Sequence, residues 1–174
     1  MSVPMSKRGL SGLEVYKNAI RIRKEFTDLL LRDFGIKNKV RDTHTYTKKM
    51  SENDIKEFDR IVKEYNIEII DRFPDWWFDV ERREVMGIFA RLIRNITDAN
   101  TIYPTNIMEH QRRRLLKDMA IANCEELFQE LQYIISVLPV DAQKYMRFVD
   151  MIETEEALLK GWRKKDNKDD KKFK

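Results

Sequence analysis

Clusters of basic side chains are the features of this sequence that point most directly to chemistry. One cluster consists of three consecutive arginines followed closely by a lysine, which are Arg112, Arg113, Arg114 and Lys117. Consecutive arginines splay around a helix, so at least one of them lies away from the core. Guanidinium groups make paired hydrogen bonds to phosphate oxygens, which favours contact with a nucleic-acid backbone.

Two further basic pairs have the i, i+3 spacing that places side chains on one helix face. They are Arg21 with Lys24 and Arg91 with Arg94. We predict that these pairs also bind phosphate. The alternative is a solvated face on which the arginines pair with nearby acids, such as Glu84, Glu109 and Asp118.

The C-terminal end holds the formal charge excess of the chain. From Gly161 to Lys174 there are seven Lys or Arg and three Asp or Glu, a net charge of +4. The whole chain has 34 basic and 30 acidic residues, also +4, so residues 1–160 carry 27 of each sign. We therefore expect a polyanion to contact this end, through Arg163, Lys164 and Lys165. The alternative is a frayed, solvated helix end.

An aromatic run, Phe73–Phe78, is the other unusual segment, and it contains Trp76, Trp77 and Phe78. Large aromatic side chains are favoured at protein interfaces, so these three predict an oligomer interface. Two alternatives are a hydrophobic plug over one end of the fold and, more weakly, a stacking platform for bases.

Signals for catalysis or metal binding are poor. The two histidines, His44 and His110, lie in different segments without a matching set of zinc ligands. A glycine-rich phosphate loop and the Glu-x-x-His motifs of di-iron proteins are missing from the sequence. Cys124 lies among helix-forming residues and is interpreted as a packing residue. We expect no enzymatic activity, no cofactor and no metal.

Length and composition favour one helical domain. The chain of 174 residues is 42% hydrophobic and 37% charged, with only five Gly and four Pro. This mixture is typical of long charged helices. A single cysteine, the lack of a long apolar run and the lack of a signal-peptide core near Met1 predict a soluble, cytoplasmic protein that does not enter membranes.

Helical periodicity recurs along most of the chain. A first helix runs from about Leu13 to a glycine stop at Gly35, and residues 36–50 are expected to be a loop. Ser51 caps the next helix, which continues to about Ile70. Pro74 interrupts the pattern, and a further helix begins at Asp75 or Asp79 and reaches about residue 100.

The second half of the chain predicts two more long helices. After Pro104, a cap at Thr105 or Asn106 begins a helix over 108–138, and Asp141 caps a helix that continues to Trp162. The short connections favour antiparallel neighbours. The predicted fold is therefore all-α, an antiparallel up-and-down four-helix bundle with an additional helix or an elongated second helix. Its domain spans residues 1–162, followed by a flexible basic tail, 163–174. The first of these helices is expected to turn Leu115, Met119, Ala122, Leu127, Leu131, Ile134 and Leu138 inward. We expect one buried set from the last two helices: Leu115, Met119, Leu127, Leu131, Ile134, Phe148, Val149 and Ile152.

Four segments of the sequence resemble one known family. They are Leu13–Ala19, Arg112–Leu116, Cys124–Leu127 and Leu158–Lys168. The sequence is similar to the four-helix bundle family of accessory variability determinant (Avd) proteins of diversity-generating retroelements. The bundle proteins encoded in intervening sequences of bacterial 23S ribosomal RNA genes are related to that family. Residues 36–75 do not match it.

The resemblance implies a non-enzymatic protein that forms a homopentamer and binds a reverse transcriptase together with its template RNA and the cDNA. It implies that the protein supports mutagenic copying of the template repeat. The basic residues named above would make the nucleic-acid contacts. The neutral body of this chain departs from the strongly basic surface of the family, which gives protein–protein contact more weight. The alternative hypothesis is a structural homo-oligomer that acts as a protein scaffold without nucleic acid.

Overall fold

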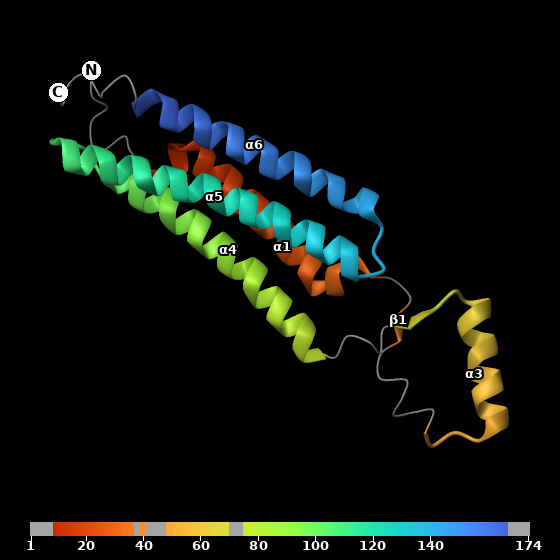
Figure 1. The fold of residues 1–174 in the computed structure, drawn as a ribbon. Coiled ribbons are helices and arrows are strands. Elements are labelled where there is room, and N and C mark those ends of the chain that lie inside the picture. The colour runs from red at the N-terminus through yellow and green to blue at the C-terminus, as the bar shows by residue number, and fades with distance from the viewer. Residues whose placement is uncertain (1–8, 37–38, 41–47, 70–74, 167–174) are drawn as a thin grey trace.

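Four long helices form the main body of the protein. In the computed structural model, which describes residues 9–36, 39–40, 48–69 and 75–166, these helices lie side by side (Figure 1). They are α1 (Glu14–Leu31), α4 (Asp75–Thr101), α5 (Ile107–Val137) and α6 (Ala142–Asp166). Helix α1 contacts α4 and α6, and α5 contacts the same two helices, so α1 and α5 lie diagonally across the body. The predicted all-α class is confirmed.

Capping side chains begin the helices at the predicted positions. The Ser51 side chain accepts from the Asp54 backbone N–H, and the Asp54 carboxylate accepts from the Ser51 backbone in return, so α3 (Glu52–Glu64) begins with a capping box. The Asn106 side chain accepts from the Glu109 N–H at 3.0 Å and begins α5. Asp141 accepts from the Gln143 N–H at 3.0 Å at the start of α6.

Backbone geometry ends the first helix near the predicted stop. Helix α1 ends at Leu31 and is followed by the short 3-10 helix η3 (Asp33–Gly35), in which Gly35 adopts φ +78°. This left-handed conformation suits glycine because it has no Cβ. A second 3-10 helix, η2 (Leu10–Gly12), precedes α1.

Three phenylalanines from different helices meet in the core. The ring centroid of Phe26 on α1 lies 5.0 Å from that of Phe89 on α4 and 4.5 Å from that of Phe148 on α6. Five residues of the predicted buried set on α5 and α6 are indeed buried: Leu127, Leu131, Ile134, Phe148 and Ile152. Burial of aromatic and branched side chains from every long helix holds the body together.

Three residues predicted to point inward from α5 are exposed instead: Leu115 is 58% exposed, Met119 is 46% exposed, and Ala122 is also exposed. Val149 on α6 is half-buried and packs against the core. The prediction joined Ala122 to Leu127, but a step of five residues turns the helix by about 140°. The true inner face of α5 instead includes His110, Lys117, Ala120, Cys124, Leu127, Leu131 and Ile134.

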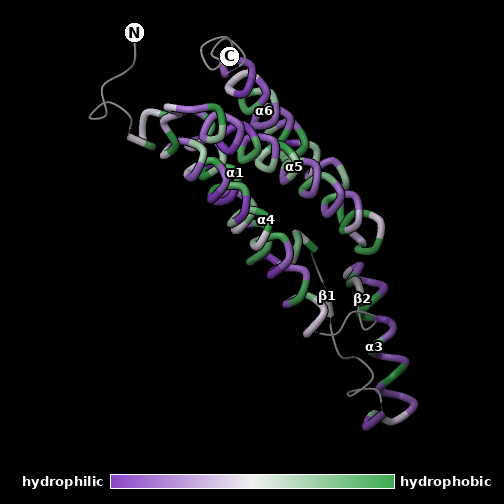
Figure 2. The backbone as a smooth tube through the Cα atoms, turned by 60° about the vertical axis from the view of Figure 1, so that its left-hand side comes forward, coloured by the Kyte–Doolittle hydropathy of each residue, from purple (hydrophilic) through white to green (hydrophobic). Residues whose placement is uncertain are grey.

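The additional helix, α3, stands apart from the four long helices in both views (Figures 1 and 2). Along the chain, α3 comes between two strands of two residues each, β1 (Lys39–Val40) and β2 (Glu68–Ile69). The two strands pair in parallel, with Lys39 opposite Glu68. The first strand falls within the predicted loop 36–50. None of the residues of α3 is buried, so this helix depends on its cap and on local ion pairs such as Arg60 with Glu57.

The boundary between body and tail differs from the prediction. Helix α6 continues to Asp166, four residues beyond Trp162. Residues 163–166 therefore belong to the helix, while the rest of the predicted tail, 167–174, lies outside the described residues. His44, the N-terminal residues 1–8 and the junction at Pro74 also lie outside them. Within the described part of the chain, none of the helices has the combined length and apolar character needed to span a membrane.

Candidate nucleic-acid interface

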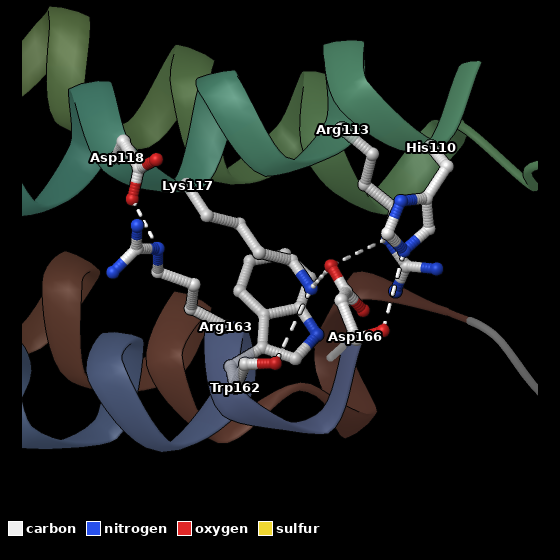
Figure 3. A network of polar contacts seen from close by, with 7 residues as sticks. All are labelled: His110, Arg113, Lys117, Asp118, Trp162, Arg163 and Asp166. Atoms are coloured by element: carbon white, nitrogen blue, oxygen red, sulfur yellow. Dashed lines mark hydrogen bonds and ion pairs between the residues drawn. The ribbon is translucent and has the colours of Figure 1, made fainter. Parts of the chain in front are cut away.

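The last turn of α6 packs against the first turns of α5. The turn at Pro139 reverses the chain, so the end of α6 returns to the region where α5 begins. Lys117 Nζ on α5 donates to Asp166 Oδ2 at 2.6 Å, and Figure 3 shows the lysine passing over the indole of Trp162 to reach it. Lys117 Nζ also donates to the Trp162 carbonyl at 3.4 Å and lies 4.1 Å from the centroid of its ring. The final helical turn is thus held by hydrogen bonds, an ion pair and a cation–π contact.

Both charged partners of this contact are buried, and this burial shifts the pKa of Lys117. Lys117 is fully buried, and the Asp166 side chain is only 6% exposed. Burial lowers the pKa of Lys117 to about 8, although the hydrogen bond from its ammonium to Asp166 opposes that shift. A lysine enclosed in this way does not reach a phosphate in solvent. The prediction that Lys117 binds nucleic acid is therefore wrong in this structure.

Two more residues of α5 hold the same end of α6. His110 is buried, and its Nε2 lies 3.2 Å from the Asp166 backbone oxygen, within hydrogen-bond distance. Arg113 Nε lies 3.9 Å from Asp166 Oδ2, and its guanidinium carbon lies 5.9 Å from the centre of the Trp162 ring. Arg113 is thus partly committed to the α5–α6 contact.

The remaining basic residues at this end face solvent to different degrees. Arg163 on α6 is half-buried and forms an ion pair with Asp118 on α5 (Figure 3). Arg114 is half-buried, whereas Arg112, Lys164 and Lys165 are exposed. The structure therefore brings the beginning of α5 and the end of α6 to the same end of the body. We define this basic end as Arg112, Arg113, Arg114, Arg163, Lys164 and Lys165.

The other predicted basic residues lie elsewhere. Arg21 and Lys24 are exposed on α1, which is diagonal to α5, and Arg21 donates to the Asn18 side chain at 2.9 Å. Arg91 on α4 forms an ion pair with Glu126 on α5 at 2.8 Å, and Arg94 is exposed on α4. The predicted set therefore does not form a single patch.

The aromatic run at the start of α4 divides between surface and core. Trp76 is 65% exposed, while Trp77 is half-buried against Phe78 and Tyr133, with ring centroids 5.3 Å and 6.3 Å away. Phe78 is fully buried and packs 5.8 Å from Phe34. Phe78 therefore cannot form the predicted oligomer interface, because the core of its own chain already surrounds it. An interface role for Trp76 and Trp77 stays a prediction.

A buried polar layer across the middle of the body was missed by sequence analysis. Asn18 donates to Glu155 Oε2 at 2.9 Å, and Asn95 donates to Asn123 at 2.9 Å. Glu155 is fully buried, and burial raises the pKa of its carboxyl to about 8. Its position three residues after Ile152 and four before Leu159 was a signal for burial, because both of those residues are in the core.

A buried thiol and a groove lie outside the basic end. Cys124 is buried as predicted, and burial raises the pKa of its thiol, which makes it a poor nucleophile. No group of His, Cys, Asp and Glu side chains among the described residues could hold a metal ion. A groove of about 650 Å³ lies between α1 and the start of α6, and its charged residues are of both signs: Glu25, Asp28, Arg32, Lys144 and Arg147.

At the basic end, Arg112, Lys164 and Lys165 are exposed to solvent. Comparison with known proteins adds no identity, since no family model, curated protein or solved structure matches this chain.

Proposed function

We propose that this protein is a non-enzymatic, cytoplasmic accessory subunit of a diversity-generating retroelement. In this role it binds the reverse transcriptase and the template RNA and supports mutagenic cDNA synthesis. We further propose that its long helices form an antiparallel up-and-down four-helix bundle that assembles as a homo-oligomer. The family resemblance implies a pentamer.

One observation supports this function most strongly. The last turn of α6 is held against α5 through Asp166, while Lys164 and Lys165 within that turn stay exposed. The sequence that follows adds four lysines and two aspartates. Two fixed lysines next to a basic segment favour contact with phosphates of any sequence, because such contacts release counterions.

A salt titration of RNA binding tests the proposal. The double variant Lys164→Glu and Lys165→Glu removes two potential phosphate contacts without altering Asp166. Each lost contact should lower the slope of log K against log salt by about 0.7 for a single strand, so the slope should fall by about 1.4. Losses should be similar for unrelated RNA sequences.

The matched control places the same charge change elsewhere. Lys48 and Lys49 are exposed next to α3, so Lys48→Glu with Lys49→Glu should leave affinity and slope nearly unchanged. Equal behaviour of the two double variants would rule out the basic end as the RNA site. A truncation should begin after Asp166, because deletion from residue 163 would also remove the contact with Lys117.

The second candidate function is a homo-oligomeric scaffold that binds no nucleic acid. The exposed apolar residues Leu115 and Met119 on α5 favour it, because such residues are typical of protein contacts. Two results would support the scaffold and defeat the first proposal. The ratio of absorbance at 260 nm to that at 280 nm would show that no nucleic acid co-purifies, and a pull-down would contain no reverse transcriptase.

A further inference from the structure

Helix α5 is apolar on two faces. Its inner face packs in the core, but a second stripe faces solvent, with Met108 77%, Leu115 58% and Met119 46% exposed and Ala122 also exposed. The steps from Leu115 to Met119 and from Met119 to Ala122 are four and three residues, so these side chains follow one line along the helix. We call Met108, Leu115, Met119 and Ala122 the outer stripe.

The two halves of α5 carry charges of opposite sign. Its first half contains Arg112, Arg113 and Arg114, whereas residues 122–137 contain three glutamates and no lysine or arginine. Two such helices placed antiparallel bring basic and acidic halves together. If Met119 of each copy lies at the crossing point, Arg112 of one copy is level with Glu126 of the other, since each is seven residues from Met119.

We propose that two copies of this chain associate through the outer stripes of their α5 helices, antiparallel, with a two-fold axis near Met119. The inference deepens the self-association included in the proposed function and rests on that part of it. A two-fold contact is self-complementary, so the pairing of Arg112 with Glu126 occurs twice. It yields an even number of chains, whether each side of the contact holds one chain or a ring of five.

An acidic seam between α4 and α5 supports a cationic partner on this face. It consists of Glu81, Glu84, Glu126 and Glu130. Burial raises the pKa of Glu81 and Glu130, and repulsion from neighbouring carboxylates adds to both shifts. Arg91 already pairs with Glu126 from within the chain. An Arg112 from a second copy adds positive charge where the carboxylates repel one another.

In this pairing, different basic residues contact the second copy and the polyanion. Arg112 contacts the second copy, while Lys164 and Lys165 on α6 stay available to a polyanion. Protein association and nucleic-acid binding can therefore be altered separately by mutation.

The first experiment measures the mass of the full chain by light scattering. The wild type should have an even multiple of 21.0 kDa, and Met119→Glu should halve that mass because it places two carboxylates together at the axis. Met146→Glu is the matched control, since Met146 on α6 is 54% exposed and outside the stripe. A wild-type monomer, an unchanged mass in Met119→Glu, or a fall to one fifth would overturn the proposal.

Charge exchange tests the antiparallel register. Arg112→Glu should weaken association about tenfold or more, because each two-fold pair then has like charges. Adding Glu126→Arg should restore it. Failure of the double variant to recover, with helicity by circular dichroism equal to that of the wild type, would overturn this register.

Cross-linking gives an independent measurement of direction. Met119→Cys should cross-link to its own copy with a short bismaleimide, whereas Met108→Cys should not. In the antiparallel pair the two residues 108 lie about 33 Å apart along the helices. The native Cys124 is buried and does not compete. Cross-linking of both variants, or of Met108→Cys alone, would instead indicate parallel helices.

RNA binding by the wild type separates this inference from the proposed function. An assembly with an even number of chains that binds no RNA would defeat the nucleic-acid role and leave the α5 contact standing. A monomer that binds RNA would do the opposite.

Discussion

Lys117 on α5 and Glu155 on α6 are both ionisable and fully buried, but only Lys117 has a partner of opposite charge. Lys117 on α5 has a carboxylate partner 2.6 Å away and the face of an indole beside it. Glu155 on α6 accepts from the Asn18 side chain, but its Oε1 has no hydrogen-bond partner within the part of the chain that the structure describes. Burial brings the pKa of each to about 8, from above for the lysine and from below for the glutamate.

The comparison shows that a paired charge can act as a structural tie and that an unpaired carboxyl is better buried neutral. Near pH 7 Lys117 carries its charge, whereas Glu155 keeps its proton. The α5–α6 end is therefore an ion pair, and the middle layer is a neutral polar contact. Each of the following variants tests one side of this difference.

The largest effect is expected for Lys117→Met. It leaves Asp166 in a buried position without its cation, which typically costs about 3–5 kcal/mol of unfolding free energy. Urea unfolding at pH 7 measures the loss. Lys160→Met, on the exposed side of α6, serves as the control and should change stability little. Adding Asp166→Leu to Lys117→Met should recover most of the loss, and equal stability of the two lysine variants would show that the ion pair stabilises nothing.

The next effect is a dependence of stability on pH that comes from Glu155. Between about pH 4.5 and pH 8 the folded protein keeps this proton and the unfolded chain releases it. The unfolding free energy should therefore fall as pH rises, by up to about 1.4 kcal/mol per pH unit. Glu155→Gln should remove this part of the slope in urea titrations. Glu153→Gln on the exposed face of α6 should leave it in place; the same flattening in both variants would contradict the assignment to Glu155.

Lys117 should produce the opposite slope over a narrower range. Between about pH 8 and pH 10.5 the unfolded chain keeps the lysine proton while the folded protein loses it, so the unfolding free energy should rise with pH. Together the two groups place a minimum of stability near pH 8. Comparing Lys117→Met with wild type across this range isolates the rise, and an unchanged alkaline slope in the variant would assign it to another group.

The smallest effect is expected for Trp162→Leu. Leucine keeps an apolar side chain in this position but removes the ring that lies 4.1 Å from the ammonium of Lys117. The loss should be about 1–2 kcal/mol, as for a desolvated cation–π contact. Trp76→Leu is the control, because Trp76 is mostly exposed on α4. If both tryptophan variants are equally stable, Trp162 acts only as a spacer between the helices.

Several parts of the fold could be predicted because they depend on neighbouring residues in the chain. Ser51, Asn106 and Asp141 bond to backbone N–H groups within three residues, and Gly35 takes its left-handed conformation where a helix must stop. Such interactions depend only on residues that are close together in the chain. The starts of these helices and the all-α class therefore followed from sequence alone. The ends of α3 and α6 did not, because they were predicted near Ile70 and Trp162 and lie at Glu64 and Asp166.

The basic end could be predicted in part. The positive charge of the C-terminal segment is a property of composition, and Lys164 and Lys165 are exposed as expected. Arg112 and Lys164 lie at the same end of the body because α6 returns to the start of α5, and the short connection at Pro139 predicted that antiparallel return.

The inner face of α5 was decided by the tertiary structure. This helix has an apolar line through Leu115 and Met119 and another through Cys124 and Leu131, so periodicity by itself could not choose between them. Helices α4 and α6 pack against the second line. The same packing buries Lys117 next to Asp166, which is 49 residues away in the chain. Sequence by itself determined where the helices begin, because hydrogen bonds from capping side chains within one turn decide that. Only packing decided which side chains are enclosed, because burial of a charge depends on partners that the chain brings together from a distance.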